Sequence, residues 1–300
     1  MLNDEWWQCR FPAMGSKAHV LGLGGPPDVE DIAAAEVERL EQCWSRFRDD
    51  SELNALNRDP APCVDVSDDL ATAVERAVLA WELTGGRFDP TVHDALVAAG
   101  YDRDFREIRE RTVSPPDTRA VPGCRDVRVD PHGGQVHRPP GLTLDLGGIG
   151  KGLAGDLVVR RLVELGVRSL SISLGGDVRV GGETPEGGWL VPVEDPFDDS
   201  SRILTVMLEH GAIVTSTTRF RRWQTSDGGW AHHLVDPTTG RPADTGVAAV
   251  VVIAAEAWWA EVLAKAALVA GPDGGRELLR HHGVEGWIVG DDAGVLSCAR

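Results

Sequence analysis

The sequence predicts an α+β fold in which mixed β-sheets are flanked by helices. Three features predict this class. Amphipathic helical patterns occur in both halves of the chain, several strand-like segments follow one another after residue 167, and strands and helices do not alternate as regular βαβ units. The 300 residues are 42% hydrophobic and 26% charged, which is typical of a globular protein with a sizeable core. We expect a single domain over residues 1–300.

In the first half of the chain we expect one strand and two long helices. Residues 16–23 form the strand. After Asp28, apolar side chains at helical spacing predict the first helix; they are Ile32, Val37, Leu40, Trp44 and Phe47. Ser67 is suited to cap a second helix, which runs through Leu83. The charged, proline-bearing residues 101–123 are predicted to form an irregular excursion.

In the second half, a glycine-rich turn precedes a third amphipathic helix, which ends at Gly166. Its apolar side chains are Leu153, Leu157, Val158, Leu162, Val163 and Leu165. Apolar and β-branched runs predict a series of strands; they cover residues 168–174, 177–181, 189–194, 203–209, 211–215, 247–254, 285–289 and 294–297. Two more helices are expected over residues 256–270 and 274–282.

The most informative segment is the turn between residues 144 and 152. An apolar, strand-like stretch, Leu142–Leu144, ends at the carboxylate of Asp145, and four glycines follow within six residues. Lys151 stands where the helix begins, although its charge opposes the helix dipole there. Exposed backbone N–H groups, a helix N-terminus and a lysine together attract a phosphate ester, and a bound pyrophosphate would explain the lysine. A tight turn with a purely structural role is the alternative.

Gly150, Gly152 and Gly155 also match the spacing of the dinucleotide-binding fingerprint G-x-G-x-x-G. That motif opens a βαβ unit and usually has an acidic ribose partner about 20 residues later. Here Gly152 and Gly155 fall inside the predicted helix, and the next strand leads into another glycine turn. An NAD-dependent oxidoreductase is therefore a weak alternative.

Two other segments carry candidate ligand contacts. Phe88 is suited to stack on a flat ring and Asp89 to accept a hydrogen bond from it; alternatively, Phe88 belongs to the core and Asp89 caps a turn. His233 precedes a turn and is a candidate general base, although a lone histidine is more often a hydrogen-bonded structural residue. His232 alternates to the other face of the strand, so only one of the two histidines points into a site.

The charge of the chain limits its partners. A formal net charge of −17 argues against a nucleic acid or an anionic membrane, because both need clustered lysines and arginines. It does not exclude a small phosphate-bearing ligand in a local basic pocket. Residues 214–223 contain four hydroxyl side chains followed by three arginines. These groups are suitable phosphate contacts, and a solvated basic turn is the alternative.

The cysteines and the N-terminal residues bear on location. Five cysteines without C-x-x-C spacing favour free thiols over a disulfide framework or a zinc site. The first residues lack the basic and apolar regions of a signal peptide, and no segment is apolar enough to span a bilayer. We expect a cytoplasmic protein without a membrane anchor.

Taken together, six segments resemble, in chain order, motifs of the ApbE-type flavin transferases, the FAD:protein FMN transferases. The segments, each with the family motif, are Phe11–Ser16 (A-M-G-T), Ser45–Phe47 with Ser51–Asn57 (S-R-F and S-E-L-S-x-L-N), Phe88–Val92 (F-D-P/V-T-V), Asp145–Gly152 (D-L-G-G-I-A-K-G-Y), Thr215–Ser216 (T-S-G) and His233–Pro237 (H-I-I-D-P). The resemblance spans nearly the whole chain. It implies an ApbE-like fold with an FAD cleft between two lobes.

The resemblance implies that the chain splits FAD at its pyrophosphate, transfers FMN to a threonine hydroxyl of a target flavoprotein and releases AMP. Some relatives only hydrolyse FAD, so an FAD pyrophosphatase and a non-catalytic FAD-binding protein are the alternatives. By motif position, His233 is the expected base, and Lys151 is expected to contact the phosphates and assist catalysis. The expected FAD-site residues are Met14, Phe47, Phe88, Asp89, Pro90, Asp145, Lys151 and Val235.

The resemblance also raises the question of a metal ion. The family's late helix typically carries A-D-A-L-A-T-A, whose Asp and Thr ligate Mg²⁺ together with a backbone carbonyl of the glycine turn, here that of Gly148. This chain has Glu261 and Lys265 at those positions. Glu261 can still ligate Mg²⁺, whereas a charged lysine has no acceptor. Either Glu261 and Lys265 form an ion pair on the helix surface, or the Lys265 ammonium takes the cation's place and Glu261 holds it.

Overall fold

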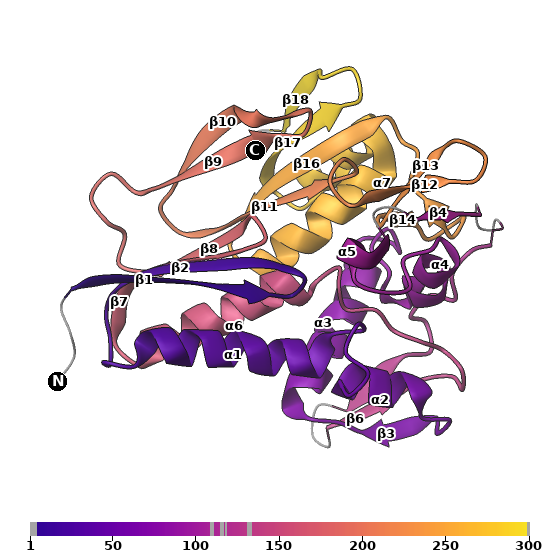
Figure 1. Ribbon diagram of the computed structural model, residues 1–300, viewed down its shortest axis with the longest axis horizontal. Helices are drawn as coiled ribbons and strands as arrows, with labels where there is room; N and C mark the ends of the chain where they lie inside the picture. Colours follow the sequence, from indigo (N-terminus) through magenta and orange to yellow (C-terminus); the bar gives the residue numbers. More distant parts are fainter. Residues whose placement is uncertain (1–4, 109–110, 115–116, 118, 131–133, 299–300) are drawn as a thin grey trace.

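An eight-stranded sheet forms the centre of the computed structural model, which describes residues 5–108, 111–114, 117, 119–130 and 134–298 (Figure 1). The strand order is β1-β2-β7-β8-β11-β16-β17-β18, and every neighbouring pair is antiparallel. The strands are β1 (Trp6–Ala13), β2 (Ser16–Gly24), β7 (Val167–Leu174), β8 (Asp177–Gly182), β11 (Gly211–Thr217), β16 (Val247–Ala254), β17 (Glu285–Gly290) and β18 (Val295–Cys298). This antiparallel sheet confirms the α+β class.

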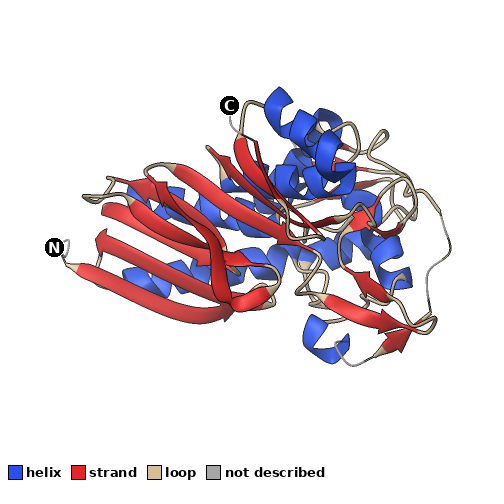
Figure 2. Cartoon of the chain, turned by 90° about the horizontal axis from the view of Figure 1, so that it is seen from above, coloured by secondary structure: helices blue, strands red, loops and turns tan. Residues whose placement is uncertain are grey.

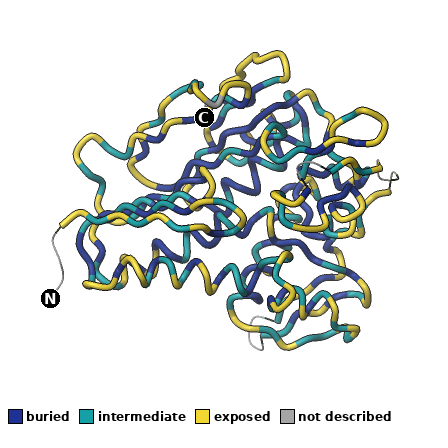
Figure 3. Tube along the Cα trace, viewed as in Figure 1, coloured by how far each residue is buried: buried dark blue, intermediate teal, exposed yellow. Residues whose placement is uncertain are grey.

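Helices cover one face of the sheet, and a β-hairpin covers part of the other (Figures 1 and 2). The long helices are α1 (Val29–Trp44), α3 (Asp68–Leu83), α6 (Gly150–Glu164) and α7 (Ala257–His281). The hairpin consists of β9 (Trp189–Asp195) and β10 (Asp198–Leu208), and its inward side chains pack on Val180 and Ile213. The sheet is therefore buried on both faces along its central strands (Figure 3).

The predicted helices and strands are found with shifts of a few residues at their ends. Ser67 caps α3 as expected, because its Oγ accepts a hydrogen bond from the N–H of Leu70 at 3.3 Å. Asp28 precedes α1 without a side-chain capping bond, and Phe47 lies beyond the helix because the chain becomes extended at Ser45. The two predicted late helices are the two parts of α7, separated at Gly271, where φ is 76°.

Strand β1 was not expected from the sequence, which mixes tryptophan, glutamine, cysteine, arginine and proline over residues 6–13. It forms the edge of the sheet and pairs only with β2, and its side chains alternate between exposed and partly buried positions. Edge strands tolerate Pro12 in a way that a central strand does not.

Smaller elements gather at one end of the main sheet, on the right in Figure 1. They are α2 (Glu52–Arg58), β3 (Cys63–Asp65), η1 (Pro90–Val92), α4 (His93–Ala98), α5 (Phe105–Ile108), β4 (Thr112–Val113), β5 (Arg128–Asp130), β6 (Gln135–His137), β12 (Arg222–Thr225), β13 (Trp230–His232), β14 (Val235–Asp236) and β15 (Arg241–Pro242). β4 pairs in parallel with β12, so one of the small sheets is mixed.

The expectation of an irregular excursion over residues 101–123 is wrong in part. Tyr101 is 5% exposed and packs with Trp223 in a small apolar cluster, and the segment supplies both α5 and β4. Residues 109, 110, 115, 116 and 118 lie outside the described residues. Buried aromatic side chains, which local propensity does not take into account, anchor this segment.

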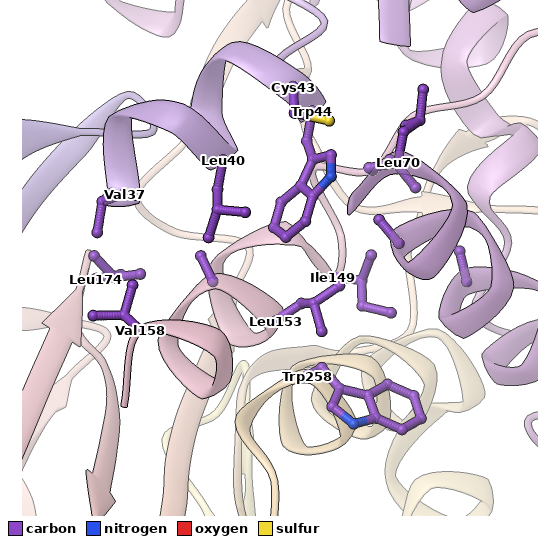
Figure 4. Close-up of a cluster of buried hydrophobic side chains, with 14 of the residues drawn as sticks. Val37, Leu40, Cys43, Trp44, Leu70, Ile149, Leu153, Val158, Leu174 and Trp258 are labelled. Atoms are coloured by element: carbon purple, nitrogen blue, oxygen red, sulfur yellow. The ribbon is translucent and has the colours of Figure 1, made fainter. Parts of the chain in front are cut away.

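The core is continuous between α1, α6, the sheet and the start of α7. Figure 4 shows side chains of these elements converging, with Leu40 and Trp44 of α1 above Leu153 of α6, and Trp258 of α7 below. This packing fixes the N-termini of α6 and α7 side by side. Within the described residues, no helix combines the length and the apolar character needed to cross a bilayer.

The close approach of α6 and α7 depends on Gly152, where a Cβ atom would overlap the carbonyl oxygen of Ala257. We expect Gly152→Ala to lower the free energy of unfolding by about 1–3 kcal/mol, because the backbone must shift to admit the methyl group. Gly155→Ala is the matched control in the same helix: its Cβ would lie 3.5 Å from Arg179 Cβ, so we expect a gain of up to about 1 kcal/mol. Urea titration measures the free energy of unfolding of both variants. Equal changes in the two would contradict the packing argument.

Candidate active site

The glycine turn is held by side chains and backbone from the neighbouring loops. Residues 142–144, which are strand-like in sequence, form no β-strand. The amide of Asn57 replaces a strand partner: its Oδ1 accepts from Leu144 N–H and its Nδ2 donates to Leu144 O, both at 2.8 Å. The N–H of Asp145 donates to the carbonyl of Pro90 at 2.7 Å. The turn therefore enters α6 in a fixed position.

Asp145 forms a buried ion pair with Arg46. Its Oδ2 lies 2.7 Å from Arg46 Nε, and the two side chains are 4% and 6% exposed. The other carboxylate oxygen accepts from Gly147 N–H at 2.7 Å, which tightens the glycine turn. The Arg46 guanidinium also lies over the rings of Phe47 and Tyr101, at 4.0 and 4.4 Å from their centroids. Asp145 thus orients both the turn and an arginine–aromatic stack.

Two adjoining cavities meet at this turn. The first has a volume of about 100 Å³, and its lining includes Phe47, Phe88, Gly148, His233 and Lys265. The second, of about 410 Å³, lies on the side of Met14 and Lys151 and shares Arg46, Phe47, Gly147 and Arg221 with the first. The two cavities adjoin along these shared residues, and we refer to them together as the cleft; the volume of the larger one is in the range of small-molecule sites.

The cleft brings together most of the residues predicted for the FAD site. Phe88 is only 5% exposed, and Asp89 caps η1 by accepting from Thr91 N–H at 2.8 Å, so both have structural roles as well as positions on the cavity wall. Phe47, 40% exposed, stands at the opening. Predicted residues that line the cleft are Met14, Phe47, Phe88, Asp89, Asp145, Gly148, Lys151, Val235, His233 and Lys265. Pro90 lies outside the lining and acts through its carbonyl on Asp145.

Lys151 is not a free cation on the wall of the cleft. Its Nζ contacts the carboxylate of Asp177 on β8 and lies 2.6 Å from Glu261 Oε1 on α7. Glu261 is fully buried, and the same oxygen accepts from Lys265 Nζ at 2.9 Å. Its second oxygen accepts from Gly152 N–H, in the first turn of α6, at 2.8 Å. We call Lys151, Asp177, Glu261 and Lys265 the charge cluster.

The charge cluster is balanced, with two carboxylates and two ammonium groups. Burial by itself raises the pKa of Glu261, but the ammonium groups of Lys151 and Lys265 overcome it and lower that pKa to about 2. Burial opposes the charged form of Lys151 as well, yet Asp177 and Glu261 raise its pKa. Burial, together with the nearby Lys151, lowers the pKa of Lys265. The Glu261–Lys265 ion pair considered from the sequence is present, but it does not lie on the helix surface, because Glu261 is fully buried and the Lys265 side chain is 14% exposed.

Residues expected to bind Mg²⁺ do not fit that ion. The two oxygens of Glu261 together already accept three hydrogen bonds, from Lys151, Lys265 and the Gly152 N–H. Lys265 carries an ammonium group with no lone pair, and Mg²⁺ demands oxygen ligands in octahedral geometry. No group of three or more histidine, cysteine or acidic side chains suited to a metal occurs among the described residues. Of the three ligands expected from the sequence, only the Gly148 carbonyl lies outside the charge cluster.

His233 and His232 face different cavities, as the strand alternation predicts. His232 lines a separate open cavity of about 700 Å³, which contains none of the predicted site residues, and its Nε2 lies 3.0 Å from the carbonyl oxygen of Ala243. His233 lines the cleft, where its buried Nδ1 has no hydrogen-bond partner among the described residues. Burial, followed by the positive charges of Arg221, His232 and Lys265, lowers the pKa of His233 well below 6.5. The imidazole of His233 is therefore neutral and can accept a proton.

Of the three arginines after the 214–218 segment, one reaches the cleft. Arg221 lines both cavities, and its two contacts, with the Tyr101 hydroxyl and the Gly15 carbonyl, are long at 3.4 Å. Arg219 pairs with Asp291 at 2.6 Å, and Arg222 stacks on Trp230. Arg221 is thus the phosphate-contact candidate among these arginines, whereas Arg219 and Arg222 contact other surface residues.

Four residues of the site are not predicted from the sequence. Arg46 lies within the S-R-F motif and Arg221 within the basic segment, but the pattern does not distinguish either from its neighbours. Tyr101 and Asp177 have no motif signal, since an isolated tyrosine and an aspartate at a strand start are common. Only the fold brings Asp177 to Lys151, across a separation of 26 residues.

Comparison with known proteins agrees with this geometry. The model of the ApbE family matches residues 14–288, which include the whole cleft. The chain belongs to the ApbE family. Among curated relatives, the FAD:protein FMN transferase of Treponema pallidum is 31% identical over 95% of this chain and 85% of its own length, and that of Escherichia coli K12 is 24% identical over 95% and 81%.

Solved structures of ApbE proteins share the fold. The ApbE protein of Thermotoga maritima has a TM-score of 0.85, 27% identity and coverage of 98% of this chain and 97% of its own. The apo flavinyl transferase ApbE of Pseudomonas stutzeri has a TM-score of 0.81, 26% identity and coverage of 98% and 95%. The ApbE-like fold expected from the motifs is therefore confirmed.

Arg46 should matter for stability because it compensates a buried carboxylate in this ApbE chain. We expect Arg46→Met to lower the free energy of unfolding by about 3–5 kcal/mol, since Asp145 is left charged and unpaired. Arg48→Met is the control: its ion pair with Glu38, itself 60% exposed, is at the surface, so a change within about 1 kcal/mol is expected. Similar losses for the two variants in urea titrations would contradict the assignment.

Proposed function

We propose that this ApbE chain transfers FMN from FAD to a threonine hydroxyl of a target flavoprotein and releases AMP. The observation that carries the proposal is a single cleft in which aromatic rings, a glycine turn at a helix N-terminus and a neutral histidine lie together. The names of the curated relatives support the same activity. FAD is the substrate of the proposed reaction.

The cleft suits each part of FAD. Phe47 and Phe88 offer apolar faces for the isoalloxazine ring. Gly147 and Gly148 allow close approach to the turn before α6, where backbone N–H groups and the helix dipole favour a pyrophosphate. Arg221, whose hydrogen bonds within the described residues are both long, is available as a charged donor to the phosphates.

The proposed reaction is a displacement at the phosphorus of the FMN half. The threonine oxygen forms a bond to that phosphorus, the bond to the bridging oxygen breaks, and AMP leaves with the bridging oxygen. The threonine proton passes to a ring nitrogen of His233, which is neutral because burial lowers its pKa. Alignment and charge neutralisation supply most of the catalysis in such transfers. Arg221 and the two ammonium groups of the charge cluster, those of Lys151 and Lys265, are the cationic groups on the walls of the two cavities.

Incubation of the protein with FAD and a threonine-bearing candidate acceptor tests this function. Mass spectrometry should show the acceptor heavier by FMN, with an equal amount of AMP released. AMP without a modified acceptor would indicate FAD pyrophosphatase activity, and bound FAD without AMP would indicate a flavin-binding protein; either result contradicts the transfer.

His233→Ala should lower the rate of transfer by about 10²- to 10⁴-fold, the usual contribution of a general base. FAD affinity should change little, because the loss concerns a proton-transfer step. His210→Ala is the control, since His210 is exposed in the turn between β10 and β11. Quenching of flavin fluorescence measures affinity, and a large loss of affinity with an unchanged rate would exclude the base assignment.

The pH dependence should follow from the lowered pKa of His233. A base acts in its deprotonated form, so kcat/KM stays constant as the pH falls and decreases only when His233 becomes protonated. Because burial lowers this pKa well below 6.5, we expect the acid limb of the profile below that value. An acid limb at or above pH 6.5 that disappears in His233→Ala would show that burial does not lower the pKa of this histidine.

A further inference from the structure

Lysine is rare in this chain, and its placement is unusual. Of the 30 lysines and arginines, only three are lysines: Lys17, Lys151 and Lys265. Lys17 is exposed on β2, whereas both others belong to the charge cluster. Arginine serves nearly everywhere else, but a compact ammonium group differs from a guanidinium in size and in geometry. Two of the three lysines of the chain thus lie together in the charge cluster beside the turn.

Lys265 reaches the cleft from α7, with Glu261 on its inner side. Its aliphatic chain runs beside the glycine turn, since a Cβ on Gly148 would lie 3.5 Å from Lys265 Cδ. Its Nζ donates to Glu261 Oε1 at 2.9 Å. An ammonium group has three N–H donors, and within the described part of the chain this is the one hydrogen bond it makes. Donors therefore remain for an anion in the cavity that Lys265 lines.

The other members of the charge cluster fix this arrangement. Glu261 is held by Lys151 and by the first turn of α6, so its carboxylate is charged and cannot turn toward the cavity. Lys151 is in turn held by Asp177. Lys151 and Asp177 are positioning residues for Glu261, and Glu261 positions Lys265. A divalent ion would have to displace these contacts to obtain its oxygen ligands.

We propose that the Lys265 ammonium group, and not a divalent metal ion, neutralises the FAD pyrophosphate beside Gly148 in this chain. This inference rests on the proposed function, because it takes FAD as the ligand. It assigns Lys265 as a catalytic residue that contacts the phosphates. It also makes the reaction independent of added metal, with the protein supplying one fixed positive charge at that position.

Binding of FAD, measured by quenching of its fluorescence, tests the inference without relying on turnover. The unmodified protein should bind FAD equally well in EDTA and in millimolar Mg²⁺. Lys265→Met should weaken FAD binding by about tenfold to hundredfold, the usual loss for a charged hydrogen bond. Riboflavin, which lacks the phosphates, should bind Lys265→Met as it binds the unmodified protein. Lys17→Met is the matched control and should bind FAD normally.

A double variant tests the same point in the opposite direction. Glu261→Asp with Lys265→Thr introduces the residue types of the family's metal-bearing helix. We expect this variant to bind FAD weakly in EDTA and to recover affinity when Mg²⁺ is added. Lys265→Met should stay folded because Glu261 keeps Lys151 and the Gly152 N–H as partners, and thermal unfolding checks this. If Lys265→Met does not fold, the Mg²⁺ dependence of FAD binding by the unmodified protein and by the double variant still tests the proposal.

The outcomes separate this inference from the proposed function. FAD binding by the unmodified protein only in Mg²⁺, or full affinity of the double variant in EDTA, would overturn the role of Lys265 and leave the transferase activity standing. Metal-independent FAD binding that depends on Lys265, without AMP release or acceptor modification, would overturn the proposed reaction and support Lys265. Absence of FAD binding under both conditions would overturn both.

Discussion

The carboxylate of Glu261 is the point on which the site depends. It is fully buried on α7, accepts from Lys151 and Lys265, and receives the N–H of Gly152 at the start of α6. A buried charge is tolerated only when it is paired and hydrogen-bonded, so this carboxylate fixes the separation of two helices and the position of two ammonium groups at once. Helix packing and the electrostatics of the cleft are therefore one feature of the molecule.

The glycine turn joins this buried cluster to the open cleft. On one side Gly152 lets α6 and α7 approach closely, and on the other Gly147 and Gly148 form part of the cavity wall. Asn57 of α2 and Arg46, which pairs with Asp145, hold the turn from the segment that follows α1. Each contact comes from a different part of the chain, which is why the cleft forms where the main sheet meets the smaller elements.

Much of this could be predicted from the sequence, because the helices, the central strands and the six motifs carry local signals. The predicted binding residues, except Pro90, lie on one cleft because motifs distant in sequence converge at the glycine turn. Strand β1 escaped prediction although its residues alternate, because Pro12 is unusual within a strand. Asp177 and Tyr101 escaped because their roles arise from tertiary contacts with Lys151 and Arg46. Likewise, the sequence showed that Glu261 and Lys265 are neighbours on a helix, but their burial is a property of the fold.

A crystal structure of the protein with FAD, grown in EDTA, tests the central claim most directly. The account predicts the pyrophosphate against the Gly147–Gly148 backbone with the Lys265 ammonium group at hydrogen-bond distance, and the flavin ring against Phe47 and Phe88. FAD in the separate cavity beside His232, or a six-coordinate ion on the Gly148 carbonyl and Glu261 in a matching crystal with Mg²⁺, would contradict it.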